Sequence, residues 1–265
     1  MPQDNHLFKL LETMRALRDT ENGCPWDIEQ DFKSIAPHTI EEAYEVADAI
    51  EKDDMTALKE ELGDLLLQVV YHSRIAEEMG LFNFDEVAQT INDKMVYRHP
   101  HVFGDQKAAE SDDVDTIWEN QKDKEKKTKD HESVLDEVAI ALPALLRAYK
   151  LQKKAARKGF EWIKLDDILS KLDEEISEFK ETIKKDQHKS DIENEIGDVL
   201  FVLANIGRHY GINPETALRN TNDKFCNRFK GMEKDLQASN EEFKDQNIED
   251  LLNLWNKQKD KEISG

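Results

Sequence analysis

Apolar side chains recur at the spacing of an α-helix along almost the whole of this 265-residue chain. No long stretch alternates between apolar and polar positions, which is the pattern of a half-buried β-strand. Apolar positions three, four and seven residues apart instead line one face of a helix. Two clear series are Leu7, Leu10, Leu11, Met14 and Leu17, and Leu65, Val69, His72, Ile75 and Ala76. The pattern therefore predicts an all-α protein.

The second half of the chain repeats the parts of the first half in the same order. The tetrapeptide GCPW at 23–26 corresponds to GFEW at 159–162, and WENQK at 118–122 corresponds to WNKQK at 255–259. Residues 119–132 include no apolar side chain, which is typical of a linker or a solvated helix end. We therefore predict an internal duplication, with tandem helical-bundle repeats at 1–125 and 126–265.

Each half carries acidic residues placed symmetrically about a turn. In the first half, Glu45 precedes Asp53 by eight residues and Glu61 follows it by eight. The polar segment at 51–54 predicts a turn, with Asp53 or Asp54 as the N-cap of the returning helix. Side chains three residues apart share one helix face, so folding this hairpin should bring the carboxylates level. The acids concerned are Glu42, Glu45, Glu61 and Asp64.

The same arrangement recurs in the second half. The midpoint of its acids falls between Asp186 and Gln187, within a polar segment that predicts the turn. Ser190 and Glu193 then predict a capping box that opens the returning helix. The corresponding acids are Glu175, Glu178, Glu195 and Asp198.

Converging carboxylates that are partly desolvated repel one another strongly. A divalent cation removes that repulsion, and oxygen ligands favour Mg²⁺ or Mn²⁺ over Zn²⁺. The alternative is a solvated acidic helix face, since 58 of the 265 residues are acidic. Two copies, each symmetric about a turn signal, favour a metal site. A di-iron centre of the Glu-x-x-His type is not expected, because no histidine stands three residues after a glutamate.

Each half also carries a lysine and an arginine four residues apart on an expected helix. Lys94 with Arg98, and Lys224 with Arg228, could bind a polyphosphate beside a metal, although an exposed basic pair is the alternative. Trp118 and Trp255 could stack on a base or pack in the core.

Composition limits the possible partners and location. The net charge of −21 argues against nucleic acid as a partner but not against a nucleotide held by local cations or a metal. Cys24 and Cys226 form no CxxC pair and are expected to be free thiols in a reducing compartment. The first residues do not resemble a signal peptide, and no apolar run reaches the roughly 18 residues of a membrane span. We therefore expect a cytoplasmic protein without a membrane partner.

The double acidic pattern, GCPWD at 23–27 and YRHPHVFG at 97–104 resemble the MazG family of all-α nucleoside triphosphate pyrophosphohydrolases. The resemblance covers nearly the whole chain, in the two-repeat bacterial arrangement. It implies Mg²⁺-dependent hydrolysis of NTPs or dNTPs between the α and β phosphates, which yields a nucleoside monophosphate and pyrophosphate. It also implies a homodimer of interlocked helical bundles.

The resemblance assigns roles to particular residues, with the second repeat competent and the first architectural or weakly active. Metal ligands would be Glu175, Glu178, Glu195 and Asp198, with a matching first set at Glu42, Glu45, Glu61 and Asp64. Catalytic residues would be Glu174, Glu175, Lys224 and Arg228, with Glu174 or Glu175 as the base. Nucleotide contacts would be Lys171, Asp191, Asn194, Asp198, Lys224, Arg228 and Trp255, with first-repeat counterparts Lys94, Arg98 and Trp118. The second copy lacks the RHPH run and carries RFKG at 228–231.

Two other functions fit the same residues. The chain could bind Mg²⁺–nucleotide as a sensor without hydrolysing it, or it could be a helical scaffold dimer with acidic outer faces. Turnover separates the sensor from the enzyme, and a metal-linked shift in thermal stability separates the scaffold from both.

Overall fold

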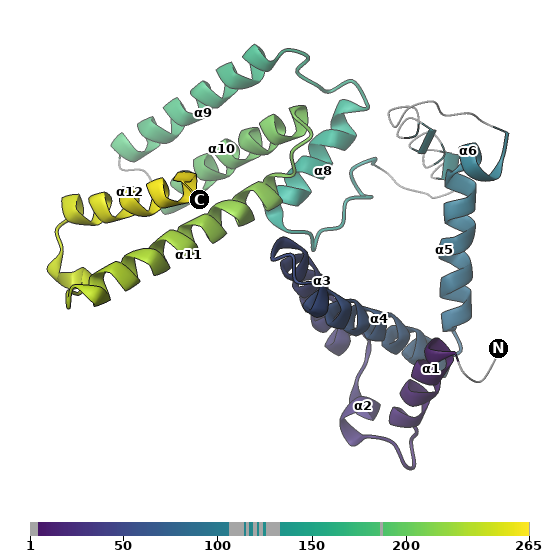
Figure 1. Ribbon diagram of the computed structural model, residues 1–265. Coiled ribbons are helices and arrows are strands. Elements are labelled where there is room, and N and C mark those ends of the chain that lie inside the picture. The colour runs from purple at the N-terminus through teal and green to yellow at the C-terminus, as the bar shows by residue number, and fades with distance from the viewer. Residues whose placement is uncertain are drawn as a thin grey trace. The chain divides into compact units, whose positions relative to one another are not determined.

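The computed structural model describes residues 5–105, positions 114, 117, 118, 121, 124 and 125, and residues 133–185 and 188–264. Helices form every regular element of the described residues, which confirms the all-α prediction (Figure 1). The chain divides into two compact units, Met1–Lys129 and Asp130–Gly265. Apart from the separate positions above, the expected linker at 119–132 lies outside the described residues. None of the described helices is long and apolar enough to cross a membrane.

The first unit is built on an antiparallel helical hairpin of α3 and α4. Asp54 caps α4 by accepting hydrogen bonds from the amides of Thr56 and Ala57, both at 3.0 Å, so one of the two N-caps proposed from the sequence is confirmed. Asp53 has a φ of 52°, a left-handed conformation that aspartate tolerates and that lets the chain reverse. The helices are α1 (His6–Leu17), α2 (Pro25–Glu29), α3 (Phe32–Glu51), α4 (Met55–Glu78), α5 (Phe84–Arg98) and α6 (Pro100–Phe103).

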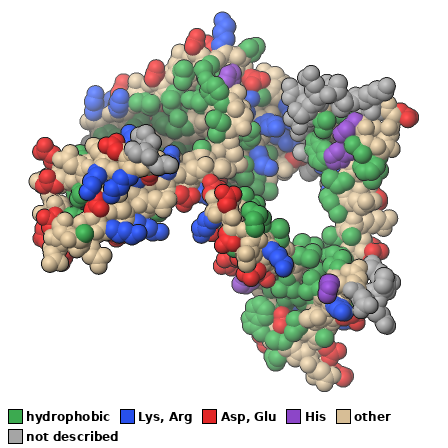
Figure 2. Space-filling model, viewed as in Figure 1, with side chains coloured by type: hydrophobic (Ala, Val, Ile, Leu, Met, Phe, Trp, Pro, Cys, Tyr) green, Lys and Arg blue, Asp and Glu red, His purple; other side chains and the backbone are tan. Residues whose placement is uncertain are grey.

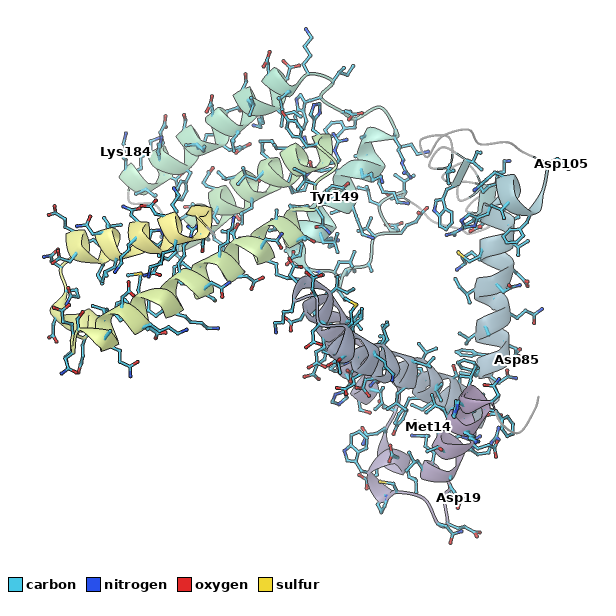
Figure 3. All side chains as sticks on the ribbon, in the orientation of Figure 1. Met14, Asp19, Asp85, Asp105, Tyr149 and Lys184 are labelled. Carbon is cyan, nitrogen blue, oxygen red and sulfur yellow. The ribbon has the colours of Figure 1, made fainter. Side chains whose placement is uncertain are left out.

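The core of the first unit lies where α1 and the start of α3 pack on the second half of α4. Its buried members are Met14, Ile35, Val70, Tyr71 and Ile75; Met14 is labelled on α1 in Figure 3. The Tyr71 hydroxyl also donates to the carbonyl oxygen of Asp27 at 2.9 Å, which ties α2 to α4. The acid-bearing first half of α4 lies outside this cluster.

The second unit contains a matching hairpin, α9 and α10, and an antiparallel pair, α11 and α12 (Figure 1). Helix α8 packs on α10, and Gln152 of α8 donates from Nε2 to the carbonyl of Phe201 at 2.9 Å. The buried apolar residues of this unit include Ile168, Val202, Ala204 and Met232. Its elements are α8 (Ala144–Ala156), α9 (Leu165–Lys184), α10 (Lys189–His209), α11 (Pro214–Ala238), the 3-10 helix η1 (Phe243–Asp245) and α12 (Ile248–Ser264).

The start of α10 differs from the prediction. The helix begins at Lys189 with His188 as its N-cap, and no side chain caps it. Ser190 therefore already lies inside the helix, so the capping box predicted for Ser190 and Glu193 is wrong. Asp186 and Gln187, between which the midpoint of the turn was predicted, lie outside the described residues.

Replacing Met14 by alanine should destabilise the first unit by about 3 kcal/mol, the range for truncating a buried large side chain. Met14 is only 1% exposed, so the substitution leaves a cavity against α4. Urea unfolding followed by circular dichroism would measure the loss. The control is Lys9→Ala on the exposed side of the same helix, which should change stability by less than about 0.5 kcal/mol. Equal effects of the two substitutions would contradict the assignment of Met14 to the core.

Candidate functional site

The hairpin of the first unit brings three of its predicted acids together. Glu42 of α3 and Glu61 and Asp64 of α4 each offer a carboxylate oxygen, and these oxygens lie within 4.8 Å of one another. Glu42 and Glu61 are half-buried and Asp64 is exposed. The turn at Asp54 therefore sets the two helices in the register that the spacing of the acids predicted.

The hairpin of the second unit forms the equivalent group. Glu175 of α9 and Glu195 and Asp198 of α10 also bring their oxygens within 4.8 Å of one another. Glu175 is buried, at 6% exposure. Lys171, one turn earlier on α9, contacts Glu174 Oε1 at 2.9 Å and Glu175 Oε1 at 2.8 Å through its Nζ. Lys171 donates these hydrogen bonds; the one to Glu174, followed by the one to Glu175, raises the pKa of Lys171 and keeps it charged.

Glu45 and Glu178, the fourth acids of the two sets, are exposed and do not belong to the three-membered groups. Both still act on the groups through space. Burial raises the pKa of Glu61, and the charge of Glu45 raises it further. Burial likewise raises the pKa of Glu178, followed by the charge of Glu175. Each fourth acid therefore faces the same charged region as its three-membered group.

The donor set fits a hard divalent cation. All donors are carboxylate oxygens, and Mg²⁺ and Ca²⁺ bind such oxygens at roughly 2.0–2.6 Å. Two oxygens on opposite sides of such an ion lie about 4–5 Å apart, which matches groups that span up to 4.8 Å. Burial and then the charge of Asp64 raise the pKa of Glu42. A bound cation would remove the repulsion that contributes to this rise.

The predicted phosphate-binding arginines lie on α5 and α11, and each is stacked on a tryptophan. The Cζ of Arg98 lies 5.2 Å from the ring centroid of Trp118, and that of Arg228 lies 5.3 Å from the ring centroid of Trp255. Each arginine also forms an ion pair with a glutamate, Arg98 with Glu125 and Arg228 with Glu262, both at 2.6 Å. For Arg228, no ion pair to the acid group of its repeat is found among the described residues.

The remaining predicted nucleotide contacts lie on exposed or half-buried helix faces. Asp191 and Asn194 share the face of Asp198 on α10, because they precede it by seven and four residues. Lys224 is exposed on α11, one turn before Arg228. The hydrogen bond from Arg228 lowers the pKa of Glu262, and the charges of Arg228 and Lys224 lower it further. Lys94 is the exposed counterpart on α5.

Comparison with known proteins identifies the group to which these repeats belong. The family model of the MazG nucleotide pyrophosphohydrolase domain matches residues 30–103 and 164–232. The chain belongs to the MazG family. Each matched segment contains one acid group and one Lys–Arg pair, whereas Trp118 and Trp255 lie beyond the segments. The resemblance predicted from the motifs is confirmed.

Relatives match the MazG chain over nearly its full length. The nucleoside triphosphate pyrophosphohydrolase of Escherichia coli K12 is 44% identical over 262 residues, which cover 98% of this chain and 99% of that protein. The nucleoside triphosphate pyrophosphohydrolase/pyrophosphatase MazG of Thermotoga maritima is 39% identical over 98% of each chain. The uncharacterized protein YabN of Bacillus subtilis is 46% identical over 91% of this chain, which corresponds to 49% of that protein.

Two glutamates that the sequence analysis missed are part of the duplicated plan. Glu125 and Glu262 each follow the repeat tryptophan by seven residues. Seven residues are about two helical turns, so a tryptophan and a glutamate at this spacing share one face of a helix. The shared Trp-x₆-Glu spacing was the signal that could have identified them.

The two MazG repeats differ beside their acid groups. Gln68 of α4 is 7% exposed and lies 134 residues before Val202 of α10, which is also 7% exposed. The Nε2 of Gln68 donates to Glu42 Oε1 at 3.4 Å, while its Oε1 is buried with no hydrogen-bond partner within the described part of the chain. The second repeat is therefore apolar at a position where the first repeat buries an amide.

A reciprocal exchange tests the cost of this amide. A buried polar atom without a partner costs about 1–3 kcal/mol. Gln68→Val removes this cost but also removes the long hydrogen bond to Glu42, so the net stabilisation of the first unit should be about 1 kcal/mol. Val202→Gln should destabilise the second unit by about 1–3 kcal/mol. Both would be measured by chemical unfolding in a buffer with chelator, so that bound metal does not contribute. Destabilisation by both changes would contradict the assignment.

Proposed function

We infer that the protein is a nucleoside triphosphate pyrophosphohydrolase that cuts NTPs or dNTPs between the α and β phosphates, giving a nucleoside monophosphate and pyrophosphate. The observation that carries this inference is the pair of all-oxygen acid groups within a chain that matches two named pyrophosphohydrolases over 98% of its length. The spacing of charges does not choose the bond that breaks, so the products are the decisive measurement.

We propose that Glu175, Glu195 and Asp198, with Glu178 beside them, hold Mg²⁺, which Mn²⁺ can replace. A divalent cation held there would polarise the phosphates and neutralise charge on the departing pyrophosphate. Lys171 supports this set because its ammonium touches Glu174 and Glu175 and fixes both carboxylates on one face of α9.

The same face supplies a general base for the attacking water. Glu175 belongs to the acid group and is buried. The side chain of Glu174 lies outside the group and is 56% exposed, so it can reach a water molecule. We therefore assign the proton acceptor to Glu174 and the ligand role to Glu175.

The nucleotide would contact residues of both the α9–α10 hairpin and the α11–α12 pair. Lys224 and Arg228 supply positive charge for the polyphosphate, and Trp255 supplies a ring face for the base. Lys171, Asp191, Asn194 and Asp198 line the hairpin side. The first-repeat counterparts are Lys94, Arg98 and Trp118.

One contact favours the second repeat as the active one. Lys171 corresponds to His38 in the first repeat, whose Nδ1 lies 3.4 Å from Glu41 Oε2 and carries a charge only when protonated. A permanent cation therefore orders the acids of the second repeat but not those of the first. We propose an architectural or weakly active first repeat.

We also propose that the protein is a homodimer. Figure 2 shows apolar side chains at the surface of both units. The most regular are spaced by four and three residues along α4 and at equivalent positions of α10, a pattern that a packed helix face requires. They are Leu62, Leu66 and Val69, and Ile196, Leu200 and Leu203, all between 38% and 50% exposed.

Product analysis tests the activity. With Mg²⁺ and a panel of NTPs and dNTPs, the protein should release a nucleoside monophosphate and pyrophosphate in equal amounts. Chelator should abolish this release, and added Mg²⁺ or Mn²⁺ should restore it. Nucleoside diphosphate with free phosphate would refute the cleavage position, and bound but uncut NTP would favour the sensor. A melting temperature unaffected by Mg²⁺, together with no turnover, would favour the scaffold.

The same substitution in both repeats tests the assignment of the active one. Glu195→Gln preserves size but removes a ligand charge, so turnover at saturating Mg²⁺ should fall about 100-fold or more, as for loss of a key electrostatic group. Glu61→Gln makes the equivalent change in the first repeat and should keep most of the turnover. Equal losses would mean two working sites, and a larger loss in Glu61→Gln would reverse the assignment.

A further inference from the structure

Arg228 is held from two directions by α12. Its Cζ lies over the indole ring of Trp255, 5.3 Å from the ring centroid. Glu262 Oε2 accepts hydrogen bonds from Nε at 3.0 Å and from Nη2 at 2.6 Å. The side chain of Arg228 is only 17% exposed. The arginine is thus fixed before any ligand arrives.

The carboxylate occupies only one edge of the guanidinium. Arginine presents two edges that can bind an anion, one formed by Nε with Nη2 and the other by Nη1 with Nη2. Glu262 takes the edge of Nε and Nη2, here called the inner edge, and the edge of Nη1 and Nη2 is called the outer edge. No bond to Nη1 of Arg228 is found among the described residues, so the outer edge is left for a phosphate.

The first unit repeats the ion pair and the ring contact. Arg98 donates from Nε to Glu125 Oε1 at 2.9 Å and from Nη2 to Glu125 Oε2 at 2.6 Å, again through the inner edge. Its Cζ lies 5.2 Å from the ring centroid of Trp118. The duplicated sequences thus place arginine, glutamate and tryptophan in the same geometry twice, which a chance surface ion pair does not explain.

We propose that Glu262 is a positioning residue of the nucleotide site, which holds Arg228 against Trp255 so that the outer edge of the guanidinium meets the polyphosphate. This inference rests on the proposed function, in which Arg228 contacts phosphate. An arginine fixed in advance loses less conformational freedom when it binds, so Glu262 strengthens substrate binding without touching the substrate.

The test compares kcat and KM for pyrophosphate release in Glu262→Ala and Glu262→Gln. Loss of the carboxylate frees Arg228, so KM in Glu262→Ala should rise about tenfold, which equals about 1.4 kcal/mol, while kcat changes less than about threefold. Glu262→Gln keeps one acceptor oxygen and should give an intermediate KM. The matched control is Glu242→Gln, which removes an exposed ion pair to Lys244 at 2.5 Å and should leave KM unchanged.

A double-mutant cycle shows whether Glu262 acts through Arg228. If it does, adding Glu262→Ala to Arg228→Ala should change KM by less than about twofold, because the guanidinium that Glu262 orients is gone. Calorimetric measurement of the binding of α,β-methylene-ATP with Mg²⁺ supplies a readout independent of turnover. Its Kd should rise with KM across the variants. A protein that binds this analogue but never cuts NTP would refute the proposed activity and still test the inference.

Three results would overturn the positioning role. Tighter binding in Glu262→Ala would mean that the carboxylate competes with phosphate for Arg228. Unchanged KM and Kd in both Glu262 variants would mean that the ion pair does not affect binding. An undiminished effect of Glu262→Ala in the Arg228→Ala background would mean that Glu262 acts elsewhere. Circular dichroism of each variant separates these results from unfolding, and Glu262→Gln replaces the alanine variant if that variant unfolds.

Discussion

Repulsion between carboxylates that face one another across a short helical hairpin is the constraint on which each half of this protein depends. Glu42, Glu61 and Asp64 bring oxygens within 4.8 Å of one another, and Glu175, Glu195 and Asp198 do the same. Burial and neighbouring charge together raise the pKa of Glu42. Such a group is unfavourable unless a cation or a basic side chain compensates it. The core of the first unit compensates in another way, because it packs around the far half of α4 and leaves the acid-bearing half outside.

The two repeats deal with this repulsion differently. In the second repeat, Lys171 touches Glu174 and Glu175, and the apolar Val202 occupies the buried position that corresponds to Gln68. In the first repeat, His38 meets only Glu41, and the amide of Gln68 reaches Glu42. The ammonium of Lys171 and a neighbouring apolar side chain order the acids for binding one ion, whereas an imidazole and a half-satisfied amide order them less. The difference is chemical rather than architectural, since both hairpins are built alike.

Helix α12, and not the acid group, positions Arg228, the arginine proposed to bind the polyphosphate. Trp255 and Glu262 stand two turns apart on that helix; the Cζ of Arg228 lies over the ring of Trp255, and Glu262 accepts hydrogen bonds from its Nε and Nη2. The ion pair is partly exposed, so it contributes little to stability. Its effect lies in the direction that the guanidinium takes. The chain belongs to the MazG family, and relatives that match nearly its full length are named as pyrophosphohydrolases. This agrees with the proposal that the acid group and the basic side chains bind one nucleotide together.

The sequence by itself determined the helical class and the acids that share each helix face, because these follow from periodicity and spacing within one helix. The duplication followed from motifs that recur in both halves, and the family from their resemblance to MazG proteins. The sequence also limited the N-cap of α4 to Asp53 or Asp54, since capping involves neighbouring residues, and the structure selects Asp54. It mispredicted the start of α10, where the His188 backbone begins the helix without a side-chain cap. Only the tertiary structure decided that Glu45 and Glu178 stand beside the acid groups, that Gln68 reaches Glu42, and that Glu262 holds Arg228. Contacts between residues 26 or 34 positions apart depend on how each helix is rotated against its neighbour, and packing sets that rotation.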